Sequence, residues 1–380
     1  MQETIPRKRY FENLDGLRFL LALVVFLSHS QFGAALKEVC NSDFLKRFIE
    51  VFTTGYYGVS FFFVLSGFLI TYLMLEEQET TSYFNVRNFY IRRILRIWPV
   101  YYAALLFSFV LYPLVKVYVG YTDQNPYNFL YQAFFLANFD SIHVREAGLA
   151  DVAPMMVGIN WSVSVEEQFY VVWPLLFLVF RGKKFIVAVV ITFITSCLFR
   201  GADISPAALY YHTLSMAADL ALGAGFAYLA FYREAAVIGF FKRLPRIAVI
   251  LAYAAGILFM MYRDRLLPGL HGLVFPRVIN TLFYSFIILE QCYSPHSFYK
   301  FSHAKRMSSF GKYTYALYML HPIGIQAAII LFRYAGLDRE TSFGMAMLYV
   351  LIALLVAMPL SMASYHLMEK KFLALRKKFY

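Results

Sequence analysis

The feature that most constrains this chain is a series of apolar runs, each long enough to cross a lipid bilayer. A spanning helix needs about 20 consecutive, mostly apolar residues, and such runs recur from near Gly16 to near Met368 of the 380 residues. Hydrophobic residues make up 60% of the chain and charged residues only 15%, whereas soluble domains are roughly 25% charged. The sequence therefore predicts an all-α, polytopic integral membrane protein.

Ten of these runs are predicted to span the membrane as a helical bundle. A shorter aromatic stretch, 127–139, is predicted to be an interfacial or re-entrant helix rather than a span. With both termini in the cytoplasm, the inner segments carry more than twice as many Lys and Arg residues as the outer ones, which obeys the positive-inside rule. The predicted spans are residues 16–36, 56–75, 97–119, 165–180, 185–199, 207–231, 247–262, 274–291, 310–332 and 343–368.

Composition also excludes several classes of protein. The net charge of +12 could suggest a nucleic-acid partner, but the basic residues form short clusters between apolar runs, which is typical of membrane proteins facing anionic lipid headgroups. Cys40, Cys197 and Cys292 are too scattered for a metal motif or a disulfide framework. No cleavable signal peptide is evident. We expect a single transmembrane domain over residues 1–380, without a fused soluble domain.

Two ionisable residues in the first span are candidate functional groups, because such residues are costly inside a bilayer. Arg18 and His29 are eleven residues apart, which places them on one helix face about 16 Å apart along the axis. Arg18 then lies at the inner end and His29 in the outer half. Alternatively, Arg18 is a lipid-facing anchor and His29 a packing residue. The shared face favours a ligand that touches both.

Two further polar groups open later spans. Arg93 and Arg96 are three residues apart on one helix face and could together bind a phosphate, or they could be another cytoplasmic basic cluster. Glu166 and Glu167 are predicted at the outer mouth of the fourth span. They would need a cavity or a partner there, unless they only complement the helix dipole.

Five sequence blocks follow one another along the chain: residues 14–18 (LDGLR) with His29, 58–69 (GVSFFFVLSGFL), 93–96 (RILR), 161–170 (WSVSVEEQFY) and 313–322 (YTYALYMLHP). In this order they resemble the acyltransferase-3 family of membrane-bound O-acyltransferases, whose bacterial members modify surface polysaccharides and other glycosides. The resemblance covers nearly the whole chain. Many members carry an aspartate where this chain has Ser60, so a role for that carboxylate is not carried over.

The resemblance implies a donor site and a catalytic site. The phosphates of a cytoplasmic acyl-CoA, most often acetyl-CoA, would dock at Arg18, Arg93 and Arg96, and the thioester would reach His29. His29 would act as general base or become transiently acylated. Because Asp15 is about 21 Å from His29 along the helix, Glu166 is preferred as the group that orients His29 or binds the acceptor. Asp15 would cap the helix or hold Arg18, and His321 is interpreted first as a packing residue. The remaining supporting residues are Ser66, Trp161, Glu167, Tyr170 and Tyr315.

The predicted activity is therefore transfer of an acyl group from acyl-CoA to a hydroxyl of a carbohydrate or glycolipid acceptor. The enzyme would be a multi-pass protein of the cytoplasmic (inner) membrane, with no metal and no permanently bound cofactor. The competing hypothesis is a transporter or flippase of a lipid-linked sugar, which predicts paired inverted repeats that the sequence does not display. An inactive family member is a third possibility. The acceptor, the acyl length and the oligomeric state stay open.

Overall fold

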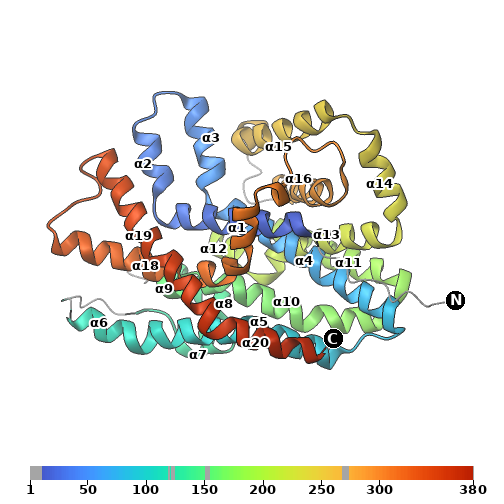
Figure 1. Ribbon diagram of the computed structural model, residues 1–380, viewed down its shortest axis with the longest axis horizontal. Helices are drawn as coiled ribbons and strands as arrows, with labels where there is room; N and C mark the ends of the chain where they lie inside the picture. Colours follow the sequence, from blue (N-terminus) through green and yellow to red (C-terminus); the bar gives the residue numbers. More distant parts are fainter. Residues whose placement is uncertain (1–10, 119, 121–124, 150–154, 268–273, 380) are drawn as a thin grey trace.

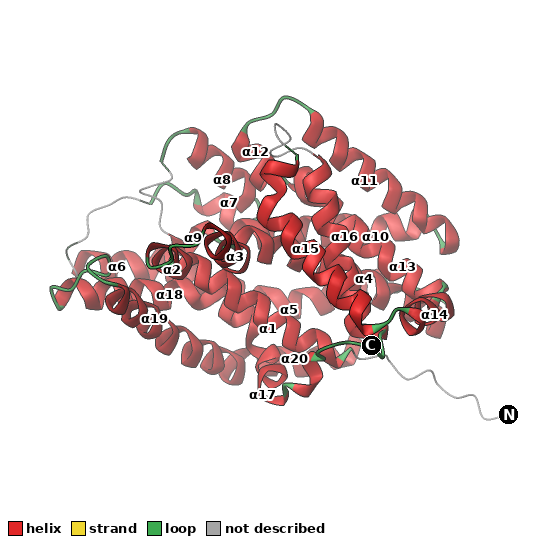
Figure 2. Cartoon of the chain, turned by 90° about the horizontal axis from the view of Figure 1, so that it is seen from above, coloured by secondary structure: helices red, strands yellow, loops and turns green. Residues whose placement is uncertain are grey.

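The structure is a computed structural model that describes residues 11–118, 120, 125–149, 155–267 and 274–379. Within these residues it is helical and has no β-strand (Figures 1 and 2), which confirms the predicted all-α architecture. The first ten α-helices are α1 (Glu12–His29), α2 (Phe32–Glu38), α3 (Asp43–Thr53), α4 (Gly55–Thr81), α5 (Val86–Leu106), α6 (Tyr112–Tyr118), α7 (Phe129–Ala133), α8 (Ala137–Glu146), α9 (Met155–Gly158) and α10 (Asn160–Val179). The others are α11 (Phe185–Gly201), α12 (Pro206–Tyr211), α13 (Thr213–Tyr232), α14 (Glu234–Arg243), α15 (Arg246–Leu266), α16 (Val274–Tyr293), α17 (Lys305–Phe310), α18 (Thr314–Tyr334), α19 (Phe343–Ser364) and α20 (Lys370–Arg376).

Eight helical segments of the described residues are long and apolar enough to cross a membrane. Most of these segments contain more than one of the helices named above, because short irregular turns interrupt them. The chain is thus a multi-pass membrane protein. The segments are Gly55–Thr81, Val86–Tyr118, Met156–Val179, Gly182–Gly201, Pro206–Tyr232, Arg246–Leu266, Lys305–Tyr334 and Phe343–Phe379.

The first predicted span, residues 16–36, is broken in the structure. Helix α1 ends at His29, and α2 leaves it at an angle of 66°. Gln31 adopts a left-handed backbone conformation with φ of 58°, which a continuing helix does not allow. Counted together, α1 and α2 would make a ninth span. His29 therefore lies at the bend itself.

The eighth predicted span, residues 274–291, corresponds to α16, which is not apolar enough to count among these segments. Its buried side chains include Arg277, Asn280, Glu290 and Gln291. The prediction of ten spans is thus above the eight or nine that length and composition support across the described residues. The mean hydropathy of α16 is low because it contains these polar side chains, which are buried against other helices, whereas three large apolar side chains of the same helix are exposed.

The aromatic stretch 127–139 forms no span in the structure. It contains α7 and the start of α8, two short helices joined at a residue with positive φ, Phe135. A buried polar network fixes them to α10: Gln132 donates to Asp140 (2.9 Å), and Asn160 donates to Gln132 (3.0 Å). Burial raises the pKa of the Asp140 carboxyl. The expectation of a short helix that does not span is in agreement with this arrangement.

Glycines let α4 and α13 pack backbone to backbone. A Cβ added to Gly67 would lie 2.0 Å from the carbonyl oxygen of Leu220, and one added to Gly223 would lie 2.0 Å from that of Val64. Small residues at such crossings let helices in membranes approach closely. This tight pair forms the centre of the bundle, and α1 packs against α4 on one side and α18 on the other.

A buried ion pair joins α13 to α16 next to this crossing. Asp219 accepts hydrogen bonds from Ser60 (2.6 Å), from Thr281 (2.8 Å) and from Arg277 Nε (2.9 Å). Arg277 also donates to Tyr56 (3.1 Å). A buried charge pair is tolerated only when its remaining hydrogen-bonding capacity is satisfied in this way. Ser60 therefore contributes to a carboxylate network, although the carboxylate itself is on α13.

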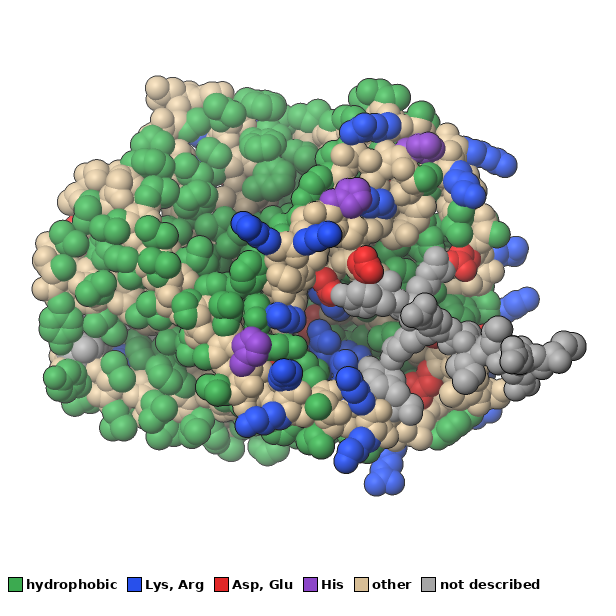
Figure 3. Space-filling model, in the orientation of Figure 1, with side chains coloured by type: hydrophobic (Ala, Val, Ile, Leu, Met, Phe, Trp, Pro, Cys, Tyr) green, Lys and Arg blue, Asp and Glu red, His purple; other side chains and the backbone are tan. Residues whose placement is uncertain are grey.

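The outer surface separates apolar from charged regions. Hydrophobic side chains cover most of the left half of the face in Figure 3, and Lys and Arg side chains gather in the right half around a hollow. Exposed leucines and valines on α11 and α19 are typical of lipid-facing helices, since lipid replaces protein as their apolar surroundings.

Candidate active site

A cavity of about 530 Å³ lies between α1, α4, α5, α10, α18 and the C-terminal segment. Seven ionisable side chains with charges of both signs line it, together with serine hydroxyls and tyrosines. The structure thus brings the three arginines predicted as the donor site to one cavity, although they come from two distant parts of the sequence. The seven side chains are Asp15, Arg18, Arg93, Arg96, Glu166, Lys312 and Glu369.

The arginines reach the cavity from α1 and α5. Arg18 lies 3.4 Å from Asp15, one turn earlier on α1. Arg93 stacks its guanidinium over the rings of Phe89 and Tyr170, at 5.6 and 5.9 Å from their centroids. Arg96 forms no hydrogen bond or ion pair with the part of the chain that the structure describes. A cavity lined by three guanidinium groups is suited to an anionic ligand.

Asp15 holds Arg18 and does not cap the helix. Helix α1 begins at Glu12, its N-terminal cap position is Phe11, and no side chain there accepts a capping hydrogen bond. Of the two roles predicted for Asp15, the structure therefore favours the pairing with Arg18.

Glu166 lies deeper than predicted. Helix α10 begins at Asn160, so Glu166 is almost two turns inside it rather than at its mouth. Ser66 donates to Glu166 (2.6 Å), and Tyr170 donates in turn to Ser66 (3.2 Å). The predicted span began at 165, whereas buried polar side chains such as Ser162 and Ser164 belong to the same helix.

The other supporting residues brace the walls of the cavity. Trp98 donates to Glu167 (3.0 Å), which joins α5 to α10. Tyr315 donates to the carbonyl of Ile97 (2.9 Å), which joins α18 to α5. Trp161 packs its ring against Tyr210 and Tyr211, with centroids 5.3 and 5.1 Å away. These three predicted residues thus have contacts that position helices around the site.

His29 pairs with His321 rather than with Glu166. The distance between His29 Nδ1 and His321 Nε2 is 2.8 Å, and the two rings are nearly parallel, at 8°. His321 is fully buried on α18, 292 residues away in the sequence. The predicted role of Glu166 as the orienting partner is therefore not supported, and His321 occupies that position.

The hydrogen bonds of His321 determine the tautomers of both rings. His321 Nδ1 lies 2.7 Å from the carbonyl oxygen of Tyr318, and a carbonyl can only accept, so this nitrogen carries the proton. In a neutral ring Nε2 is then an acceptor, and His29 must donate to it from Nδ1. His29 Nε2 is left with a free lone pair, which is the arrangement a general base or nucleophile needs.

Tyr318 connects this histidine pair to the cavity. Tyr318 and Ser162 both line the cavity, and their hydroxyls share a hydrogen bond. The ring of Tyr318 lies 6.1 Å from that of His321 on one side and 6.1 Å from that of Phe62 on the other. The ring of Tyr318 thus separates the histidine pair from the cavity. Along α1, Arg18 is about 16 Å from His29.

Several residues at the site were missed by the sequence analysis. Tyr318 belongs to the recognised block 313–322, but its position facing Ser162 depends on how α18 packs against α10. Lys312 and Glu369 are charged residues next to apolar runs, and that alone was the available signal. Among the described residues, no cluster of His, Cys, Asp and Glu side chains could hold a metal ion.

Comparisons with known proteins show what this chain is similar to. The peptidoglycan O-acetyltransferase OatA of Listeria monocytogenes is 26% identical over 83% of this chain, and a putative peptidoglycan O-acetyltransferase of Bacillus subtilis, YrhL, is 27% identical over 60%. A putative O-acetyltransferase of Staphylococcus aureus is 28% identical over 45% of the chain. The chain spans about half the length of the Listeria relative (49%), and 34% and 25% of the other two. No solved structure matches.

The family model described as an acyltransferase domain, Acyl_transf_3, matches residues 11–366. This match includes α1 with its arginine and histidine, both arginines of α5, and α18 with His321. Because the match extends over nearly the whole chain, the protein belongs to the acyltransferase-3 family.

Proposed function

We propose that this protein is a membrane O-acetyltransferase that moves an acetyl group from cytoplasmic acetyl-CoA to a hydroxyl of a cell-envelope glycan. The observation that carries the proposal is the cavity itself. Three arginines line it toward one end, and at the other end the ring of Tyr318 lies between the cavity and the histidine pair. Its relatives named for O-acetyl transfer to peptidoglycan support the acetyl group and a carbohydrate acceptor.

The arginines suit the diphosphate of coenzyme A. Arg18 and Arg96 present guanidinium groups to the cavity from α1 and α5, so a diphosphate between them would be contacted from two sides. The pantetheine arm would then extend past Phe62 and Val59, and its thioester would come close to Tyr318. The rise of α1 from Arg18 to His29, about 16 Å, is comparable to the length of such an extended arm.

At the thioester, His29 Nε2 would take the proton of the acceptor hydroxyl while the hydroxyl oxygen attacks the thioester carbonyl. The new carbon–oxygen bond forms, the carbon–sulfur bond breaks, and the proton passes from His29 to the departing thiolate to give free CoA. The hydrogen bond to His321 keeps Nε2 in the basic form before each cycle. In the alternative route, His29 Nε2 attacks first, and acetyl-histidine then accumulates when no acceptor is present.

The proposed orientation places both termini and the arginine end of the cavity in the cytoplasm. The positive-inside distribution of Lys and Arg supports this assignment, and so does the origin of acetyl-CoA inside the cell. The acceptor would approach the histidine pair from the opposite side, in the bacterial cytoplasmic membrane. CoA would then remain on the cytoplasmic side throughout.

The proposal is tested with purified protein in sealed, oriented vesicles. Radiolabelled acetyl-CoA is supplied to the face that carries the termini, and soluble peptidoglycan fragments are supplied to the other. We expect acetylated glycan from the wild type and none from His29→Ala, while the exposed histidine variant His303→Ala serves as the matched control. Near-normal transfer by a folded His29→Ala protein would refute the mechanism, and product formed only when both substrates share one face would refute the sidedness.

A further inference from the structure

Lys312 is a fourth cation of the cavity, and the proposed mechanism gives it no role. It lies in the turn Gly311–Tyr313 before α18, and it is exposed on one side. Gly311 packs directly on α1: a Cβ added to it would lie 2.7 Å from Asp15 Cβ, and Asp15 is one turn before Arg18. Along α1 the order is therefore Lys312, then Arg18, then His29. Lys312 marks the end of the cavity that is farthest from the histidine pair.

Aromatic rings hold the Lys312 ammonium without neutralising it. Its Nζ lies 4.9 Å from the centroid of Tyr313 and 5.8 Å from that of Tyr365. Tyr313 is fixed in turn by a hydrogen bond with His366 (3.1 Å). Within the described residues Lys312 has no hydrogen bond and no ion pair. Cation–π contacts position a charge while leaving its hydrogen-bond donors available.

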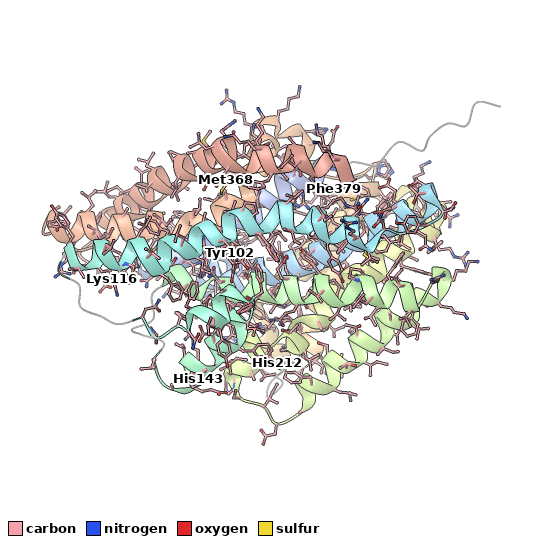
Figure 4. The ribbon with its side chains drawn as sticks, turned by 90° about the horizontal axis from the view of Figure 1, so that it is seen from below. Tyr102, Lys116, His143, His212, Met368 and Phe379 are labelled. Carbon is pink, nitrogen blue, oxygen red and sulfur yellow. The ribbon has the colours of Figure 1, made fainter. Side chains whose placement is uncertain are left out.

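The C-terminal segment completes this end of the cavity. A π-helical turn, Tyr365–Glu369, joins α19 to α20 and places Tyr365, Glu369 and Leu373 in the lining. Such turns occur frequently at functional sites. Figure 4 shows this segment, with Met368 and Phe379 labelled, running alongside α5. Arg92 donates to the carbonyl of Phe379 (2.6 Å), which ties the end of the segment to α5.

The charges at this end are arranged for a ligand with separate anionic groups. Asp15 already pairs with Arg18 (3.4 Å), and Glu166 accepts from Ser66. Glu369 is buried and accepts from Ser364 (3.3 Å). The three carboxylates therefore have hydrogen-bond or ion-pair partners other than Lys312, whose own contacts are with aromatic rings.

We propose that Lys312 binds the 3′-phosphate of the donor nucleotide and makes the enzyme select CoA over 3′-dephospho-CoA. This inference rests on the proposed function for the identity of the donor. With the thioester near His29 and the diphosphate at the arginines, the nucleotide lies farther out along the same line, where Lys312 is. A phosphomonoester is a compact, strongly charged group, and the lysine ammonium binds phosphate as a point charge.

The test measures binding of CoA and of 3′-dephospho-CoA to the detergent-purified protein by calorimetry. Lys312→Ala should weaken CoA binding about tenfold or more, the value of one hydrogen bond to a charged group, and should leave 3′-dephospho-CoA binding unchanged. Lys312→Arg should restore most of the preference, because it keeps the charge. Lys305→Ala, a nearby exposed lysine outside the cavity lining, is the matched control and should bind both ligands as the wild type does.

An anionic lipid headgroup offers the same phosphate chemistry, so the binding is repeated in nanodiscs with and without anionic lipid. The inference is overturned if Lys312→Ala weakens both nucleotides equally, weakens neither, or acts only when anionic lipid is present. If the wild type binds neither nucleotide, the donor assigned under the proposed function is wrong and the inference falls with it. If the wild type binds CoA and 3′-dephospho-CoA with one affinity, the inference alone is wrong.

Discussion

Replacing His321 separates a catalytic role for the histidine pair from simple packing. His321 accepts from His29 Nδ1 at 2.8 Å and donates from its own Nδ1 to the Tyr318 carbonyl at 2.7 Å. In His321→Ala the first of these partners is lost, and His29 is free to carry its proton on either nitrogen. Whenever the proton is on Nε2, no lone pair faces the acceptor. We therefore expect a lower kcat with little change in the KM for the donor, since Arg18 and Arg96 are unaffected.

The size of the effect follows from the hydrogen bond. A neutral hydrogen bond contributes about 0.5–1.5 kcal/mol, and a buried donor left without a partner costs about 1–3 kcal/mol. At about 1.4 kcal/mol per factor of ten, this corresponds to a roughly ten- to hundredfold fall in kcat. His29→Ala removes the base itself, which contributes about 10²–10⁴-fold. His321→Ala should therefore be impaired, but less than His29→Ala.

Two conservative variants make the assay specific. The side-chain oxygen of Gln is close to the place of histidine Nε2, whereas that of Asn is closer to Nδ1. His321→Gln should thus recover much of the activity by accepting from His29, and His321→Asn should not. Initial rates of acetyl transfer are measured in vesicles, with thermal midpoints and CoA binding as checks on folding. Wild-type kcat in His321→Ala, or equal activities of the Gln and Asn variants, would refute the assignment of the tautomers.

Two other substitutions test the donor site and the packing. Arg96→Ala should weaken CoA and 3′-dephospho-CoA binding alike by about 1.5–3 kcal/mol, because Arg96 is assigned to the diphosphate; calorimetric affinities equal to those of the wild type would point to a different donor. Gly223→Ala should lower the thermal midpoint in detergent, because its Cβ would lie 2.0 Å from the Val64 carbonyl oxygen and overpacking costs about 1–3 kcal/mol. Gly239→Ala, which has open space around it, is the control for this second change, and an equal midpoint in both variants would contradict the close helix contact.

The parts of the site that lie on one helix could be predicted from the sequence. The face shared by Arg18 and His29 follows from helix periodicity alone, and so does the pairing of Arg93 with Arg96. That these three arginines line one cavity was implied by the family resemblance, because helix periodicity does not determine how α1 lies relative to α5. The partner of His29 could not be predicted in this way, because His321 is 292 residues away and only tertiary packing brings it within 2.8 Å.

The errors in the spans have a common physical origin. Hydropathy treats a polar residue as exposed to water, but Ser162, Ser164 and Arg277 are buried against other helices. The predicted span that contains Glu166 begins at 165, whereas the helix begins at 160. The prediction therefore placed the Glu166 carboxylate nearer the surface than the structure does. For α16, buried polar side chains such as Arg277 lower the mean hydropathy, so this helix does not count among the apolar segments. The orientation of the termini stays a prediction.

The position of His29 at the end of α1 connects the fold to the chemistry. Because α1 is unbroken from Glu12 to His29, the separation of Arg18 from His29 is set by the helical rise and does not depend on loops. Val25 packs against Gly58 of α4, which keeps the middle of α1 fixed between the two residues. The chain then turns by 66°, so no helix continues over the His29 ring on that side. In the proposed mechanism, a donor anchored at Arg18 would thereby be presented to His29 at a constant depth, which the rigid helix sets.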